Sequence, residues 1–269
     1  MNSINRKTII FFAGLLAAVS LYSCGDGIEN STETVTPTET LHYALPSIGV
    51  GRDYILSDET VLSVEMMPQI ICIDPGHGFD DGGTSSEYLG GLNEDDITIA
   101  VSLMLEEELN KLGYQTVLTH NGQEFPVTSA YDNNNKYRPQ ERTAFANSVN
   151  IDYYVSIHCN SHTNPEAEGT RIYYYDGYIK REHTSDVIAE AINEGILQQL
   201  EPGSISSTIE MTENVFHVLR ETKVPASLVE MGFVTNESDA AKMLDENWQR
   251  SFARGIAAGI DSYYRSNNN

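Results

Sequence analysis

From residue 69 onward the chain alternates short apolar runs with longer segments in which apolar residues recur every three or four positions. The run at 70–73 (IICI) is the first of the short ones, whereas Trp248, Phe252 and Ile256 show the longer period. Short apolar runs are typical of buried strands, and a period near 3.6 is typical of amphipathic helices. The alternation predicts an α/β fold: a single domain with a mixed, mostly parallel, twisted sheet flanked by helices on both faces.

These patterns predict individual elements. Strands are expected over the apolar runs at 70–73, 116–119, 152–157, 170–175, 215–219 and 226–229. Helices are expected from the N-cap Asn93 to a stop at Gly113, from Pro139 onward, over 184–200, and over a final segment that ends near Ile260.

The chain is strongly acidic. It carries 39 Asp and Glu against 16 Lys and Arg, which gives a formal net charge of −23. A nucleic-acid binder needs a basic face to displace counterions from the phosphates, so this charge excludes that class. Three cysteines are too few for a disulfide scaffold. Cys72 and Cys159 lie in or at the end of predicted strands, where bridging geometry is poor, and free thiols are expected.

The N-terminus has the features of an export signal. Two basic residues precede an apolar stretch over residues 9–21, and Ser23 comes directly before Cys24. The stretch is shorter than the roughly 20 residues that cross a bilayer as a helix. A small residue followed by cysteine at this distance resembles the lipobox of bacterial lipoproteins, which predicts a signal peptide at 1–23 and a lipid on Cys24. An ordinary signal peptide and an uncleaved anchor are the alternatives.

A polar segment separates this signal from the rest of the chain. Residues 24–68 are rich in Ser, Thr, Glu and Asp and show no helical period. Such a composition is typical of a solvated linker, so a flexible, lipid-anchored tether is expected there. The folded domain is then expected over residues 69–266.

Four residues with acid–base or metal-binding chemistry fall at one predicted edge of the sheet. His77, His158 and Glu230 each come at or just after the end of a predicted strand. Glu94 lies in the first turn of the helix that follows the first of these strands. Because the carboxyl ends of parallel strands share one edge, these side chains are expected to converge. Two imidazoles and a carboxylate are the ligands of a catalytic zinc site, and a further carboxylate can act as general base.

Each of these residues also has an ordinary structural interpretation. A single histidine after a strand is more often a hydrogen-bonded turn residue than a ligand. Glu94 suits the positive end of a helix dipole in any protein. Glu230 is harder to explain in this way, because a buried carboxylate costs on the order of several kcal/mol unless it is paired or functional.

Several motifs, taken together and in order, resemble one enzyme family. They are 74–78 (DPGHG), 94–97 (EDDI), 141–142 (ER) with 146–147 (AN), 155–160 (VSIHCN), and 218–220 (VLR) through Pro225 to 228–233 (LVEMGF) with Asn236. From about residue 69 to 264 the chain is similar to the zinc-dependent N-acetylmuramoyl-L-alanine amidases that carry a type 3 amidase domain.

The resemblance implies a reaction, a cofactor and residue roles. The reaction is hydrolysis of the amide between N-acetylmuramic acid and L-alanine in peptidoglycan, with one zinc ion. His77, Glu94 and His158 match the family's zinc ligands, and Glu230 matches its catalytic glutamate. In that scheme zinc activates a water and polarises the carbonyl, while Glu230 takes up the proton and passes it to the leaving amine. Cys159 is expected to pack beneath the site and not to act as nucleophile.

The sequence departs from relatives in two places. Glu210 and Glu213 stand in a segment, 206–213, that is often basic in the family, so the way the stem peptide is held stays open. Between Tyr175 and Val215 there is room for one helix and a short loop, without the long inserted helix that blocks the site in some relatives. Activity without an activator protein is therefore expected, and no activator can be named.

Two other functions remain compatible with these residues. One is a catalytically inactive peptidoglycan-binding protein, although an intact set of ligands and base argues against it. The other is a zinc peptidase that cuts within the stem peptide, because the same ligands and base can cleave any amide presented to them.

The predicted lipid anchor also indicates location and partners. It predicts an exported protein held in a membrane through Cys24, and the lack of wall-binding repeats favours the outer membrane, facing the periplasm of a diderm bacterium. The expected partner is a muramyl peptide of peptidoglycan, no nucleic acid is expected, and the protein is expected to be a monomer.

Overall fold

The computed structural model describes residues 5–10, 22–23, 52–57, 60–65, 68–126, 138–175, 184–211 and 216–267. Residues Ile70–Ser266 form one compact unit, and Met1–Gln69 form a second with the last three residues. The two units are described separately below. Cys24 lies outside the described residues, so the lipid anchor predicted there stays a prediction.

The N-terminal unit contains a small sheet. Its strands are β1 (Asn5–Ile10), β2 (Tyr22–Ser23), β3 (Arg52–Ser57) and β4 (Thr60–Glu65), in the order β2-β1-β4-β3. The β3–β4 pair is antiparallel, and β1 runs parallel to β4. The predicted signal peptide at 1–23 and tether at 24–68 stay predictions. Among the helices that the structure describes, none is long and apolar enough to cross a bilayer.

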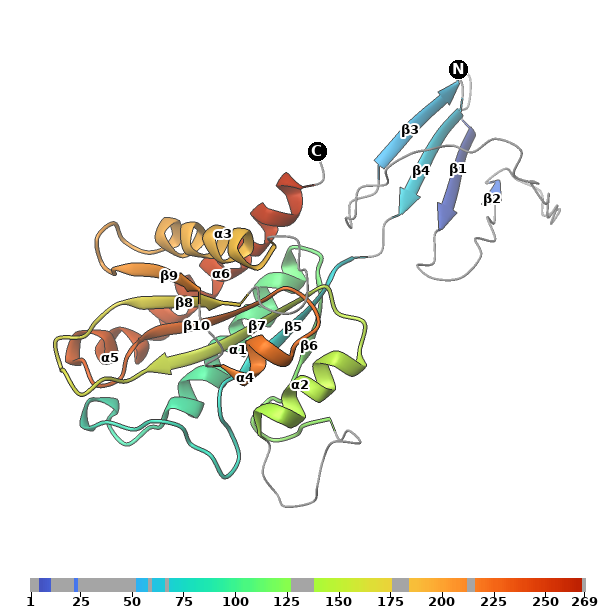
Figure 1. Cartoon of the computed structure of the whole chain (residues 1–269). Coiled ribbons are helices and arrows are strands. Elements are labelled where there is room, and N and C mark those ends of the chain that lie inside the picture. Colours follow the sequence, from blue (N-terminus) through green and yellow to red (C-terminus); the bar gives the residue numbers. More distant parts are fainter. Residues whose placement is uncertain are drawn as a thin grey trace. The chain divides into compact units, whose positions relative to one another are not determined.

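The larger unit is built on a six-stranded sheet (Figure 1). Its strands are β5 (Ile70–Pro75), β6 (Gln115–Leu118), β7 (Tyr153–Asn160), β8 (Thr170–Tyr174), β9 (Ser207–Met211) and β10 (Ala226–Phe233). The strand order is β6-β5-β7-β10-β8-β9. Every neighbouring pair is parallel except β8 and β10, which are antiparallel. The predicted single α/β domain with a mixed, mostly parallel sheet is confirmed.

Helices connect and cover the strands. They are the short 3-10 helix η1 (Glu87–Leu89) and α1 (Glu94–Lys111), α2 (Pro139–Ser148), α3 (Thr184–Gln199), α4 (His217–Glu221), α5 (Glu237–Met243) and α6 (Glu246–Ser266). The start of α1 is set by a capping box between Asn93 and Asp96, and Pro139 opens α2 in its first turn. Both starts agree with the sequence prediction.

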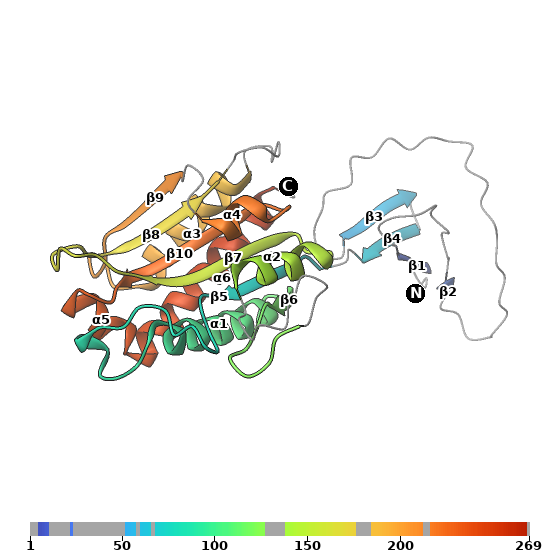
Figure 2. The ribbon, with the colours of Figure 1, turned by 60° about the horizontal axis from the view of Figure 1, so that its bottom comes forward.

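The two faces of the sheet carry cores of different size. The larger core lies under α1, α3 and α6 and includes Ile73, Val155 and Val229. The other face is covered by α2 and α4 (Figure 2). The smaller core lies under them and includes Cys72, Tyr154 and Leu228. Successive strand residues point to opposite faces, so neighbours in sequence serve different cores. The predicted covering of both faces by helices is confirmed.

Glycine allows the two long helices of the larger core to touch. A Cβ atom on Gly195 of α3 would lie 2.3 Å from the carbonyl oxygen of Gly255 in α6. A Cβ atom on Gly259 would lie 2.4 Å from the Cα of Ile192. Because both distances are shorter than any real Cβ contact, α3 and α6 can meet backbone to backbone only with glycine at these places.

Several elements of the larger unit differ from the sequence prediction. The apolar run at 215–219 was expected to be a strand, but His217–Glu221 form the helix α4. Val218 and Leu219 still bury their side chains in the smaller core, so the run is apolar for packing and not for strand pairing. Short apolar runs do not distinguish these cases by periodicity. The edge strand β9 and the short helix α5 were not predicted.

Candidate metal centre

Three of the predicted site residues come together at the carboxyl edge of the sheet. His77 follows β5, His158 lies near the end of β7, and Glu94 is the first residue of α1. One ligand atom from each lies within 4.8 Å of the others. The Glu94 carboxylate is 3.3 Å from His77 Nε2 and 3.1 Å from His158 Nδ1. The two imidazole rings lie edge to face, with their centroids 5.0 Å apart.

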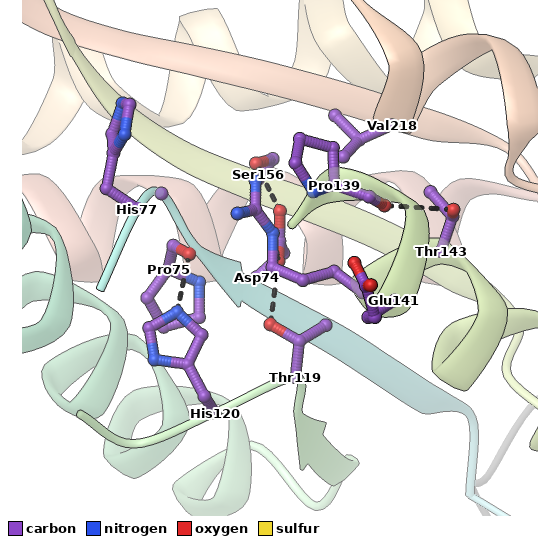
Figure 3. Close-up of polar contacts among 12 residues, drawn as sticks. Asp74, Pro75, His77, Thr119, His120, Pro139, Glu141, Thr143, Ser156 and Val218 are labelled. Carbon is purple, nitrogen blue, oxygen red and sulfur yellow. Dashed lines mark hydrogen bonds and ion pairs between the residues drawn. The ribbon is translucent and has the colours of Figure 1, made fainter. Parts of the chain in front are cut away.

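The loop that carries His77 is held at its backbone by three other elements. The N–H of Gly76 donates to the carbonyl of Ile157 in β7 at 2.8 Å. The hydroxyl of Thr98 in α1 donates to the carbonyl of Gly76 at 2.7 Å, and His120 Nε2 contacts the carbonyl of Pro75 at 2.9 Å (Figure 3). These bonds support a left-handed φ of 64° at His77, a conformation that residues other than glycine rarely adopt.

Gly76 also provides the space for a ligand. A Cβ atom at this position would lie 2.5 Å from the imidazole of His158. The absence of a side chain at Gly76 thus lets the β5 loop pass directly against the second imidazole. Gly83 likewise leaves space for the first imidazole and the carboxylate, because a Cβ atom at this position would lie 2.7 Å from both His77 and Glu94.

The carboxylate of Glu94 is buried, and both of its oxygens accept hydrogen bonds. Each of its oxygens accepts a backbone N–H bond, from Cys159 at 2.9 Å and from Thr84 at 2.9 Å. Burial alone would raise its pKa, but hydrogen bonds and charge from His158 and His77 hold that pKa well below the ordinary value. Glu94 is therefore ionised, as a metal ligand must be.

Asp81 orients His77 from outside the ligand group. Its carboxylate is 2.9 Å from His77 Nδ1, which leaves Nε2 directed at Glu94. Burial alone would lower the pKa of His77, but bonds and charge from Glu94 and Asp81 raise it to about 9. A carboxylate on the outer nitrogen of a ligating histidine is the usual second-layer partner in metal sites. The sequence interpretation missed Asp81, whose only signal is its place four residues after His77.

Glu230 is not one of the three gathered side chains, but it lies on the strand next to His158. It lies in β10 directly opposite His158 of β7, so both side chains point to the same face of the sheet. Glu230 is 8% exposed, and its Oε2 has no hydrogen-bond partner among the residues that the structure describes. Burial raises its pKa to about 7. A buried carboxylate with a free oxygen and this pKa is suited to accept a proton at neutral pH.

The three gathered side chains fit one metal ion. Two imidazoles and one carboxylate are a known ligand set for catalytic zinc, and such sites leave a further position for water. The fit rests on the chemistry and convergence of His77, Glu94 and His158. Other divalent ions also accept these ligands.

The thiol of Cys159 lies away from the gathered ligands. Its side chain is buried in the larger core, on the opposite face of the sheet from His158. Burial raises the pKa of its thiol well above the ordinary value, so the reactive thiolate is disfavoured. Cys72 and Cys159 are both free and buried, as expected.

Comparison with known proteins gives a consistent result. The profile of the family described as N-acetylmuramoyl-L-alanine amidase matches residues 71–262. Over 197 residues the chain is 34% identical to the uncharacterized protein YqiI of Bacillus subtilis, covering 72% of this chain and 84% of YqiI. It is 30% identical to the N-acetylmuramoyl-L-alanine amidase LytC of Bacillus subtilis, covering 73% of this chain but 36% of LytC.

Solved structures show the same similarity. The amidase AmiC2 of Nostoc punctiforme superposes with a TM-score of 0.61 at 31% identity, over 73% of this chain and 97% of that one. The catalytic domain of CwlV, an N-acetylmuramoyl-L-alanine amidase from Bacillus (Paenibacillus) polymyxa, gives a TM-score of 0.60 at 28% identity, over 72% and 97%. The described region from β5 to α6 accounts for the similarity.

Proposed function

The chain belongs to the Amidase_3 family of N-acetylmuramoyl-L-alanine amidases, and on this premise we propose that it cleaves the amide between N-acetylmuramic acid and L-alanine in peptidoglycan with Glu230 as general base. The observation that carries the proposal is the position of Glu230. Its carboxylate, whose Oε2 has no hydrogen-bond partner in the described part of the chain, stands one strand away from His158, on the same face of the sheet. The proposed base and the proposed ligands therefore face the same reacting group.

The roles of the side chains follow from this arrangement. His77, Glu94 and His158 would hold a single zinc ion, which supplies an activated water and polarises the carbonyl of the scissile amide. Glu230 accepts the proton that the attacking water loses and returns it to the nitrogen of the departing L-alanine. Asp81 keeps the His77 ring in its ligating orientation. No side chain forms a covalent bond to the substrate.

Digestion of purified peptidoglycan tests the reaction. The chain from residue 25 onward is incubated with zinc, with a chelator, or as the Glu230→Gln variant, and products are identified by mass spectrometry. Free stem peptides that begin with L-alanine, formed only by the zinc-loaded native protein, are expected. Cuts within the stem would instead show a peptidase. Binding without cleavage in the presence of zinc would show a wall-binding protein.

The Glu230→Gln variant separates the base from the ligands. We expect its zinc content to stay near that of the native protein, while the rate falls on the order of a hundredfold or more. Glu190→Gln is the matched control, because Glu190 is exposed on α3, on the opposite face of the sheet. A Glu230→Gln variant with the native rate would remove Glu230 from the role of base.

We also propose that the mature protein is a lipoprotein with Cys24 as its lipidated first residue, held in the outer membrane on the periplasmic side. The support is the order of a basic start, an apolar stretch over residues 9–21, Ser23 and Cys24. Fractionation of cells that make the Cys24→Ala variant is the test. Release from the membrane with an intact amidase is expected, whereas continued membrane attachment would show that the apolar stretch itself is the anchor.

A further inference from the structure

The one antiparallel pair in the large sheet places an arginine beside the proposed base. Because β8 runs opposite to β10, its first residues lie at the edge where the parallel strands end. Arg171 of β8 pairs directly with Glu230 of β10, which in turn pairs with His158 of β7. Directly paired residues point to the same face, so all three side chains project from one row across the sheet.

The guanidinium of Arg171 is held loosely. Its Nε is 3.6 Å from the carboxylate of Glu210, and Nη1 donates to the carbonyl of Thr170 at 3.0 Å. Its central carbon lies 5.5 Å from the ring centroid of Phe233. The side chain is 23% exposed and that of Glu210 is 49% exposed. A long ion pair between partly exposed groups contributes little free energy, so another carboxylate can replace Glu210.

We propose that Arg171 binds a carboxylate of the stem peptide, and that Glu210 occupies this position in the free protein. The proposal rests on the proposed amidase function and adds a substrate preference to it. Arginine presents five N–H donors in a planar fork that matches a carboxylate in bidentate fashion. Nη2 and the remaining Nη1 hydrogen are the donors that the contacts described above leave for the substrate.

Distances along the substrate identify which carboxylate is in reach. Paired residues on neighbouring strands have Cβ atoms about 5 Å apart, and one peptide residue spans about 3.5 Å. If the scissile amide lies at Glu230, then Arg171 reaches a group one to two residues into the stem. A free α-carboxylate on the second stem residue is within this reach and carries the negative charge that pairs with a guanidinium, whereas a carboxamide at the same atom is neutral.

The charge of the protein makes such a contact selective. The chain has a net charge of −23. An anionic stem is repelled by this field unless a cation meets it locally.

The test compares two disaccharide–peptide substrates that differ only at the second stem residue, D-glutamate with a free α-carboxylate or the corresponding α-carboxamide. The measured quantity is the ratio of kcat/KM for the acid to kcat/KM for the amide, in the zinc-loaded protein. We expect the native ratio to be about ten or more and the Arg171→Met ratio to fall to about one. Arg250→Met is the control, because Arg250 lies on α6 and pairs with Glu246 there.

Further variants keep the test decisive if Arg171→Met does not fold. Arg171→Lys retains the charge but not the fork and should give an intermediate ratio. Glu210→Gln removes the competing carboxylate and should raise the ratio severalfold. A native ratio near one, or an equal ratio in native protein and Arg171→Met, would overturn the proposal. Hydrolysis of neither substrate by the native protein would instead count against the amidase function itself.

Discussion

Arg142 and Asp74 form an ion pair in the interior of the domain, with Nε 2.8 Å from Oδ1 and side-chain exposures of 3% and 0%. Asp74 also accepts hydroxyl bonds from Thr119 and Ser156, each at 2.6 Å (Figure 3). Asp74 is the residue three positions before His77, and Arg142 belongs to α2. The pair therefore ties α2 to the strand end from which the metal-site loop departs.

Asp74→Asn should destabilise the domain by about 3–5 kcal/mol at pH 7, because it leaves the Arg142 charge buried without a partner. Burial alone would raise the pKa of Asp74, but Arg142 and the hydroxyl bonds lower it. A lowered folded-state pKa gives stability that is present above the unfolded value near 4 and is lost as the pH falls below it. The deficit should shrink toward pH 3.5 in denaturant titrations. An equal deficit at pH 7 and 3.5 would contradict this account.

Gly76→Ala should weaken zinc binding more than it weakens the fold. The added methyl group would meet the His158 ring at 2.5 Å, and a ligand displaced by about 0.5 Å or more no longer holds the productive geometry. We expect a loss of zinc affinity of about tenfold or more, measured by competition with a chelating dye. Gly203→Ala is the control, because its φ of 77° is strained but no atom lies within 4 Å of the added carbon. Equal zinc affinities in the two variants would exclude the steric explanation.

Zinc should stabilise the native protein against heat but not the His158→Ala variant. A ligand at a hundred times its dissociation constant stabilises the folded state by about 2.7 kcal/mol, and loss of one of three ligands removes most of that affinity. Thermal unfolding with and without a chelator measures the difference. His162→Ala is the control, since His162 is exposed in the loop after β7. A native protein whose melting temperature is the same in both conditions would argue against a bound metal.

Glu230→Gln should make the zinc-free domain more stable at alkaline pH. Burial raises the pKa of Glu230 to about 7, whereas an unfolded glutamate titrates near 4.5. The folded state therefore favours the protonated form, and its advantage disappears as the pH rises through 7. We expect the variant to gain about 1–3 kcal/mol at pH 8 and about nothing at pH 4.5. A variant less stable than the native protein at pH 8 would show that the ionised carboxylate has a stabilising partner.

The sequence predicts that His77, Glu94, His158 and Glu230 gather at one edge of the sheet, because the signal is local. His77, His158 and Glu230 each follow or end an apolar run, and parallel strands bring such positions to one edge. Glu94 is likewise identified by its place in the first turn of α1, directly after the N-cap Asn93. These features depend on short stretches of sequence and on one general property of parallel sheets.

Other parts of the site depend on tertiary contacts that short stretches do not encode. Arg171 reaches the site only because β8 is antiparallel to its neighbour, and its sequence does not fix the direction of pairing. Arg142 meets Asp74 across 68 residues through the docking of α2. The run at 215–219 is apolar in either a strand or a helix, and the packing of Val218 and Leu219 in the smaller core as part of α4 decides between them.

Because the larger core lies on one face of the sheet, the two faces should differ in how many substitutions they tolerate. The interdigitated glycines of α3 and α6 and most of the large buried side chains lie on the face of the sheet away from Glu230 and Arg171. Substitutions near Glu230 and Arg171 therefore disturb few of the contacts in the larger core. Directed evolution aimed at the partly exposed positions of β8 and β9, such as Arg171 and Glu210, should yield folded libraries with altered stem preference, whereas libraries at the buried positions of α3 and α6 should lose much of their folded protein.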